Sequence, residues 1–162
     1  MGQLHVEAEQ TARATPEVLW ALISDVTRYP EWGPWSAAGY RQPGDTAPRG
    51  PGAVQWLRSA RRAYLRYVTS IEKILVVEEP RRLAYTVIGG IPVRNYHAEI
   101  TLTPTAAGTH VRWAATWDAT LAGRFVQRGL RTFYPQVVAD LVAAAEEQSA
   151  EPAAERRAAG LG

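Results

Sequence analysis

The stretch HVRWAATWDATLAGRFVQRGLRTFYPQVVADL, residues 110–141, changes its hydrophobic period partway along. As far as Asp118, apolar and polar residues alternate, which is typical of a strand with one buried face. From Leu121 the apolar residues recur every three or four positions, and this helical pattern continues to Gln148. The sequence therefore predicts a strand followed by one long amphipathic helix, and the apolar face of each must be covered by another element.

Further strands are predicted upstream from alternating or continuous apolar runs. They are residues 3–12, 54–58, 64–77, 83–88 and 93–103. Short turns such as Gly89-Gly90-Ile91-Pro92 join the later strands, and such turns connect antiparallel neighbours. The terminal helix is the one predicted element long enough to cover the sheet. We therefore expect an α+β fold in which this helix lies across a curved antiparallel β-sheet.

Two short helices are predicted after the first strand. Thr15 suits a helix N-cap and Pro16 suits the first helical position, so a helix should run from here to about Asp25. A second helical turn should end at Tyr29, because the residue before a proline is disfavoured in the helical conformation.

A long loop is predicted over residues 33–52, which are dense in glycine and proline. Loops of this length often carry binding functions. Trp32 precedes the loop and Trp35 begins it. We expect Trp32 to pack at the end of the sheet near the long helix and Trp35 to lie on a movable lip.

Aromatic residues with polar tips gather on the predicted inner face of the sheet. A solid core would favour Leu or Ile, because the Trp N–H and the Tyr O–H need hydrogen-bond partners. The pattern therefore predicts the walls of a small-molecule cavity, and the competing interpretation is a dry, interdigitated core. The predicted ligand-binding residues are Trp32, Trp35, Tyr67, Tyr85, Tyr96, Trp113, Trp117, Phe125, Phe133 and Tyr134.

Candidates for acid, base or cationic roles are few. Arg66 would face the cavity if the even-numbered residues of its strand point inward, but a bulge within residues 71–77 would change that phase. His97 is a natural acid/base, yet its alternation with Tyr96 favours the outer face. Glu72 lies in the same apolar run as Arg66 and is given no role. The catalytic residues therefore stay unassigned, with Arg66 and His97 as weak candidates.

Composition excludes several classes of function. The net charge is +2, with 18 basic and 16 acidic residues dispersed along the chain, which argues against nucleic-acid binding. The chain has no cysteine and three histidines, so we expect neither a metal site nor a cofactor. No apolar run is long enough to span a membrane, and no signal peptide is evident, so we expect a cytoplasmic protein.

The length of 162 residues suits one domain, which we assign to residues 1–148. Residues 149–162 lack an apolar period and are predicted to be a flexible tail. The sequence leaves a monomer and a homodimer both open.

Three motifs resemble one known family: DVTRYPEW at 25–32, VVEEPRRLAY at 76–85 and GTHVRW at 108–113. Together they are similar to the polyketide cyclase/dehydrase and lipid-transport family of the START-like (SRPBCC) superfamily, over residues 3–147. The resemblance implies a helix-grip fold with a deep hydrophobic cavity, and a setting in bacterial secondary metabolism. It implies either cyclisation, aromatisation or dehydration of a polyketide-like ligand, or non-catalytic carriage of a hydrophobic molecule. A third alternative is an interaction domain that docks through residues 33–52.

In aromatase/cyclase members of this family, a pocket arginine and a tyrosine are thought to act. This sequence offers no unique arginine for that role, which leaves the catalytic alternative the weaker one. No motif of a hydrolase, a kinase or a dinucleotide-binding enzyme is present.

Overall fold

The computed structural model describes residues 2–63 and 66–160, with the side chains of residues 61–63, 66, 152–154 and 156 left out. Within this part of the chain a seven-stranded sheet has the order β1-β7-β6-β5-β4-β3-β2, and all neighbouring strands are antiparallel. The strands are β1 (Gln3–Ala12), β2 (Trp35–Gln42), β3 (Val54–Ala63), β4 (Arg66–Glu78), β5 (Arg82–Gly89), β6 (His97–Thr105) and β7 (Gly108–Asp118).

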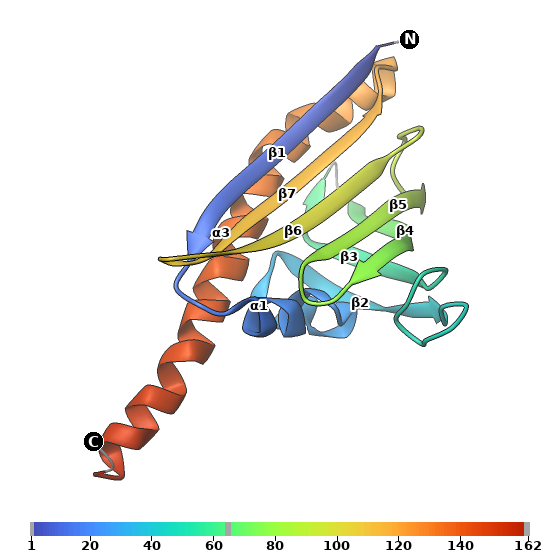
Figure 1. Ribbon diagram of the computed structural model, residues 1–162. Helices are drawn as coiled ribbons and strands as arrows, with labels where there is room; N and C mark the ends of the chain where they lie inside the picture. The colour runs from blue at the N-terminus through green and yellow to red at the C-terminus, as the bar shows by residue number, and fades with distance from the viewer. Residues whose placement is uncertain (1, 64–65, 161–162) are drawn as a thin grey trace.

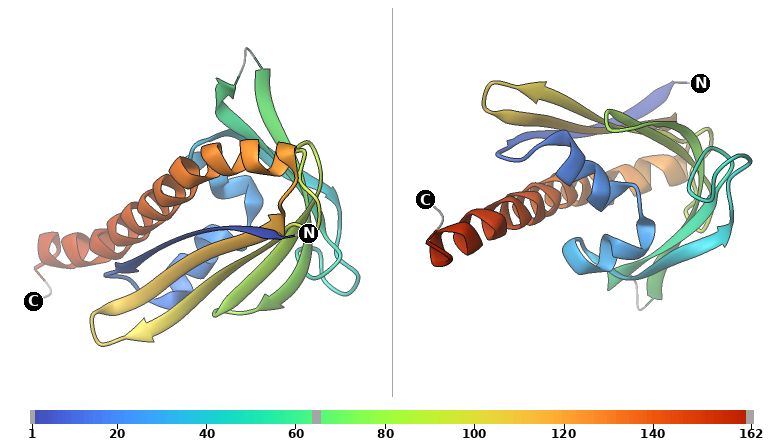
Figure 2. Two further views of the ribbon diagram at one scale, coloured as in Figure 1. Left: turned by 90° about the horizontal axis from the view of Figure 1, so that it is seen from above. Right: turned by 60° about the horizontal axis from the view of Figure 1, so that its bottom comes forward.

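The sheet curls around one long helix, α3 (Leu121–Ala158), which packs across β1 and β7 (Figure 1, Figure 2). Thr120 caps this helix, because its hydroxyl accepts a 2.9 Å hydrogen bond from the Gly123 amide. Val138 and Leu141 on α3 are fully buried, and each such side chain stabilises the fold by about 1.5 to 3 kcal/mol. The α+β helix-grip fold expected from the sequence is confirmed.

The end of α3 lies further along the chain than the sequence indicated. The helix continues through Pro135, which is exposed, and past residue 148 to Ala158. Its C-terminal part extends beyond the sheet (Figure 1). The flexibility assigned to residues 149–162 stays a prediction.

The short helices are α1 (Pro16–Ile23), the 3-10 helix η1 (Val26–Arg28) and α2 (Tyr29–Trp32). Thr15 caps α1 as predicted. The prediction that helical structure ends at Tyr29 is wrong, because Tyr29 has φ −56° and ψ −39° and α2 continues from it. Pro30 is tolerated there because it lies in the first turn, where a missing N–H breaks no helical hydrogen bond.

Part of the predicted loop is an edge strand. β2 pairs with β3 and contains two register shifts, which adapt it to the curved sheet. Gly39 lies under the Trp56 indole, and a Cβ at this position would come within 3.0 Å of Trp56 Nε1. The expectation of a movable lip at Trp35 is therefore corrected: Trp35 begins β2 and is 9% exposed.

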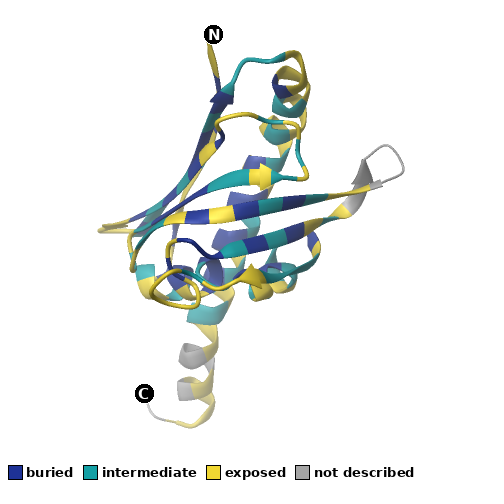
Figure 3. Ribbon diagram, turned by 90° about the vertical axis from the view of Figure 1, so that its right-hand side faces the viewer, coloured by how far each residue is buried: buried dark blue, intermediate teal, exposed yellow. Residues whose placement is uncertain are grey.

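Buried and exposed residues alternate along several strands, as Figure 3 shows. On β7, Val111, Trp113 and Trp117 are buried on the inner face, as the sequence predicted. β4 contains register shifts against β5, which confirms the expected irregularity of this strand. The inner face of the sheet and the apolar face of α3 enclose one core.

Candidate functional site

A carboxyl group is buried on the inner face where β3, β4 and β5 lie side by side. Glu72 on β4 has Gln55 on β3 and Val87 on β5 as its cross-strand neighbours. Gln55 Nε2 donates a 2.9 Å hydrogen bond to Glu72 Oε2, and Ser70 Oγ donates a 3.2 Å hydrogen bond to Oε1. Each carboxyl oxygen therefore has a donor, which offsets part of the cost of removing the group from water.

A row of tyrosine hydroxyls connects the sheet to α3. The Trp113 indole Nε1 donates a 3.1 Å hydrogen bond to the Tyr85 hydroxyl. Tyr134 on α3 hydrogen-bonds Tyr96, which directly precedes β6, and the Tyr85 ring lies 6.4 Å from the Tyr96 ring, measured between centroids. The Tyr96 ring also stacks on Trp117 with 5.6 Å between the ring centroids. These contacts bring together five of the residues that the sequence predicted for the ligand site.

The titration of these groups is governed by burial. Loss of water around Glu72 raises the pKa of its carboxyl from 4.5 to about 7, against the lowering effect of the Gln55 and Ser70 hydrogen bonds. Burial, together with the negative charge of Glu72, raises the pKa of Tyr85, Tyr96 and Tyr134 well above 10. Near neutral pH the tyrosine hydroxyls therefore keep their protons and can donate hydrogen bonds. The Glu72 carboxyl is present in both its protonated and its ionised form.

Residues of this cluster keep a small exposure to solvent, as do core residues elsewhere such as Leu4 and Val142, which are 8% and 7% exposed. Glu72 is 8% exposed, and Tyr85 and Tyr96 are each 6% exposed. Ile100 and Trp117, on adjacent inner-face positions, are not exposed at all.

An aromatic cluster closes one end of the grip. Trp35 lies 5.0 Å from Tyr29, 5.4 Å from Trp32 and 5.7 Å from Phe133 of α3, measured between ring centroids. Tyr29 and Trp32 each donate a hydrogen bond to a backbone carbonyl of α1, at Ile23 and at Leu22. These bonds satisfy the polar tips, so the cluster forms a packed end wall.

Three other predicted residues lie away from the cluster. Tyr67 and Phe125 are 45% and 53% exposed, because Tyr67 lies near the tip of the β3–β4 hairpin and Phe125 on the exposed side of the first turns of α3. His97 lies on the outer face, 3.8 Å from Glu99, which is the face that its alternation favoured. The side chain of Arg66 lies outside the described part of the structure.

Glu72, Gln55 and Ser70 are the site residues that sequence reasoning missed. The alternation Ser70, Glu72, Ile74 carries the signal, since all three are buried on one face of β4. Ile71 and Val76 obscured it, because they make the run look apolar on both faces. The register shifts of β4 could not be located from the sequence.

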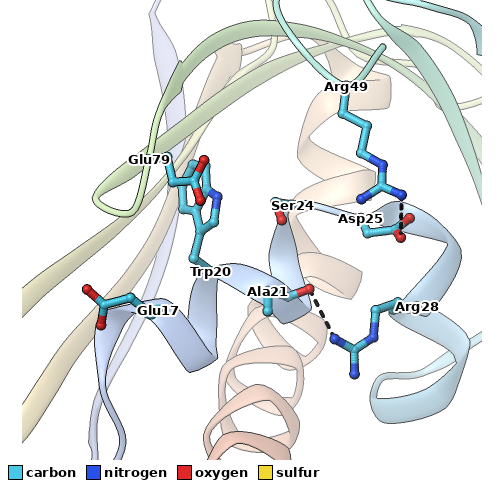
Figure 4. A pocket seen from close by; sticks show the side chains of 8 residues that line it. All are labelled: Glu17, Trp20, Ala21, Ser24, Asp25, Arg28, Arg49 and Glu79. Atoms are coloured by element: carbon cyan, nitrogen blue, oxygen red, sulfur yellow. Dashed lines mark hydrogen bonds and ion pairs between the residues drawn. The ribbon is translucent and has the colours of Figure 1, made fainter. Parts of the chain in front are cut away.

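Two pockets open outside the grip. One, of about 410 Å³, lies between α1 and the β4–β5 turn, where Trp20 and Glu79 face Arg28 and Asp25 (Figure 4). Two of its charged side chains are paired with each other, since Arg49 binds Asp25 at 2.9 Å, and Arg28 donates a hydrogen bond to the Ala21 carbonyl. A second pocket, of about 370 Å³, lies beside the β2–β3 connection. Neither lies between the sheet and α3.

Two negative findings apply to the described residues. No group of three or more His, Asp or Glu side chains there could hold a metal ion. No helix in that part of the chain has the length and apolar character needed to cross a membrane.

Several solved structures share this fold. TTHA0849 from Thermus thermophilus is 18% identical with a TM-score of 0.71, over 90% of this chain and 99% of that one. A Nitrosospira multiformis protein is 19% identical with a TM-score of 0.67, also over 90% and 99%. Ara h 8.0201 is 17% identical with a TM-score of 0.63, over 88% and 99%. At such low identities the likeness concerns the fold.

No curated protein matches this chain at a significant level. A family model described as polyketide cyclase/dehydrase and lipid transport matches residues 3–146, which include every strand and most of α3. Polyketides and lipids are both hydrophobic ligands, in keeping with the aromatic inner face. The chain therefore belongs to the polyketide cyclase/dehydrase and lipid transport family.

Proposed function

We propose that the protein binds a hydrophobic, polyketide-like or lipid-like small molecule between the sheet and α3, beside Glu72 and the tyrosine row. The observation that carries this proposal is the buried Glu72 carboxyl with its two donors, set among apolar and aromatic side chains. Small-molecule sites typically combine apolar walls with a few polar groups that orient the guest. Family membership supports the same function.

The polar groups of the cluster support the placement of the guest. The Glu72 carboxyl and the tyrosine hydroxyls lie within an interior that is otherwise mostly apolar. The guest would therefore occupy the space next to Glu72, and neighbouring side chains would move apart to admit it.

A pair of substitutions on one strand tests this placement. Val87 lies on the inner face opposite Glu72, and Ile88, the next residue, is 55% exposed. We expect Val87→Trp to fill the space and lower the affinity for the neutral hydrophobic dye Nile red by at least about tenfold. Ile88→Trp adds the same ring on the opposite side and should leave the affinity unchanged.

Dye fluorescence measures binding, and circular dichroism of both variants confirms that they are folded. Equal dye binding by Val87→Trp and the parent protein would place the guest elsewhere, for example in the pocket beside α1.

Trp113→Ala should also abolish binding, because Trp113 holds the hydroxyl of Tyr85 in place. Native mass spectrometry of freshly purified protein tests the proposal independently, since a co-purifying small molecule is expected.

If the protein is an enzyme as well as a binding protein, it would catalyse cyclisation, aromatisation or dehydration of the guest. Glu72 is the group suited to move a proton at neutral pH, because the pKa of its carboxyl is about 7. If the protein is catalytic, pure protein converts the co-purified molecule and Glu72→Gln stops the conversion while binding persists. Arg66 stays a predicted contributor, and Arg66→Ala belongs in the same assay.

Carriage without turnover is the alternative function. It is favoured by the tyrosines, whose raised pKa values leave none of them able to act as a base at neutral pH. Binding without conversion, unaffected by Arg66→Ala and His97→Ala, is the outcome expected of a carrier. Conversion by pure protein that is lost on one polar substitution contradicts carriage. A homodimer and a role in bacterial secondary metabolism stay predictions.

A further inference from the structure

We propose that the interior selects a neutral guest that offers a hydroxyl group to Glu72 and a carbonyl oxygen to the tyrosine row, and that it excludes carboxylate anions such as free fatty acids. This inference deepens the proposed function and rests on it. Within the wide class of hydrophobic molecules, it favours hydroxylated ketones over lipid acids.

The exclusion of anions follows from the charge inside the grip. Among the side chains that the structure describes, Glu72 is the one charged residue that is buried. Its donors, Gln55 and Ser70, are neutral and cancel none of its charge. A guest carboxylate beside it would place two negative charges in a poorly solvated space, where their repulsion is weakly screened.

Two half-buried arginines of the sheet do not offset this charge. Arg82 on β5 binds Glu99 at 3.0 Å and Glu78 at 3.1 Å. Arg112 on β7 forms an ion pair with Glu7 on β1. These pairs lie on the outer face of the sheet, so among the described side chains no lysine or arginine is buried beside Glu72 to hold an anionic guest.

The preference for a hydroxyl follows from the lone pairs of Glu72. Each carboxyl oxygen accepts one hydrogen bond from the protein. An ionised carboxylate has about four acceptor positions, so capacity remains for a guest O–H. Val87, the residue opposite Glu72 on β5, is apolar and brings no competing donor.

The preference for a carbonyl follows from counting protons in the tyrosine row. Tyr85, Tyr134 and Tyr96 have three O–H protons, and the hydrogen bond between Tyr134 and Tyr96 uses one of them. Trp113 donates its own N–H to Tyr85 and so uses a lone pair there, not a proton. Phenolic protons are therefore left for a further acceptor, and a guest carbonyl provides one.

A matched pair of probes tests the exclusion of anions. The unchanged protein is titrated at about pH 8, where Glu72 is ionised, with 2-naphthalenemethanol and with 2-naphthoate, which share one ring system. We expect the alcohol to bind at least about tenfold more tightly than the carboxylate, measured by tryptophan fluorescence or calorimetry. In Glu72→Gln this ratio should fall by at least about fivefold, because the repulsion is gone.

A second probe pair tests the preference for a carbonyl. We expect 2-acetylnaphthalene to bind at least as tightly as 2-ethylnaphthalene, because the spare tyrosine proton compensates for desolvation of the ketone. A ketone that binds more weakly than the hydrocarbon overturns the assignment of a donor to the tyrosine row.

The outcomes distinguish a failure of the proposed selectivity from a failure of the proposed ligand-binding function. If the alcohol and the carboxylate bind equally well, or if Glu72→Gln leaves their ratio unchanged, the selectivity is wrong while ligand binding stands. If none of the probes binds at millimolar concentration, the proposed function fails and the inference fails with it. If Val87→Trp still binds both the alcohol and the carboxylate, the guest does not lie beside Glu72. The proposed location is then wrong, and the selectivity argued from it fails as well.

Discussion

The side-chain amide of Gln55 donates a 2.9 Å hydrogen bond to the Glu72 carboxyl across the β3–β4 pair, on the face of the sheet that α3 covers. This bond supplies a dipole but no positive charge. It therefore makes burial of Glu72 tolerable without fixing it in the ionised form. Burial raises the pKa of the carboxyl to about 7, although the hydrogen bonds from Gln55 and Ser70 lower it.

Stability should fall as the pH rises from about 4.5 to about 7. In this interval the unfolded chain has lost the Glu72 proton whereas the folded protein retains it, so folding binds a proton and is favoured at the lower pH. The shift of the pKa from 4.5 to about 7 corresponds to a loss on the order of 3 kcal/mol in the free energy of unfolding.

Glu72→Gln should remove this contribution, since an amide does not titrate. The measurement is urea denaturation at a series of pH values, and the informative quantity is the difference between parent and variant, because other groups cancel in it. A difference that stays constant from pH 5 to pH 8, within about 0.5 kcal/mol, contradicts the prediction.

Removing one hydroxyl of the tyrosine row should destabilise the fold. Tyr134→Phe breaks the hydrogen bond to Tyr96 and leaves the Tyr96 hydroxyl with fewer partners in a buried site. We expect a loss of about 1 to 3 kcal/mol in the free energy of unfolding. Tyr67→Phe is the matched control, because Tyr67 is 45% exposed, and it should change stability by less than about 0.5 kcal/mol.

Trp35 should behave as a core residue and not as part of a mobile lip. Trp35→Ala removes ring contacts with Tyr29, Trp32 and Phe133, and we expect a loss of about 3 to 5 kcal/mol in the free energy of unfolding. Trp56→Ala on the outer face of β3 should cost clearly less, because Trp56 is only partly buried. Chemical denaturation measures both losses, and a loss below about 1 kcal/mol for Trp35→Ala restores the lip interpretation.

His97 should be dispensable for both stability and binding. Its side chain is 49% exposed and lies 3.8 Å from Glu99, a pair that contributes between about 0 and 1 kcal/mol. We expect His97→Ala to change the free energy of unfolding by less than about 0.5 kcal/mol and to leave Nile red affinity unchanged. A tenfold weaker affinity in the variant would assign His97 a part in the site that its outer-face position does not explain.

Residue patterning predicts the elements of this fold well where each element has one buried face. The alternation over residues 3–12 predicts the first strand, and these are the bounds of β1. The capped start of α1 at Thr15 is also predicted correctly, because an N-cap bond joins residues three apart in the chain. Such signals are local, so the sequence contains them in full.

Patterning fails where a distant partner overrides local preference. Gly39 in β2 is a residue type that favours loops. The segment is nevertheless a strand, because it pairs with β3 and the Trp56 ring packs against Gly39. Tyr29 precedes a proline, yet its ring is buried between Trp32 and Trp35, and this packing keeps it helical. Tertiary contacts routinely outweigh propensities of this size.

The sequence by itself determined a curved antiparallel sheet around a terminal helix, an aromatic inner face and the absence of cysteine chemistry, because periodicity and composition are properties of the chain alone. Only the tertiary structure decided that Glu72 faces inward. The side on which a strand residue lies depends on register and bulges, and the shifts along β4 are set by its pairing with β5. The same pairing places Glu72 where its charge acts on Tyr85, Tyr96 and Tyr134.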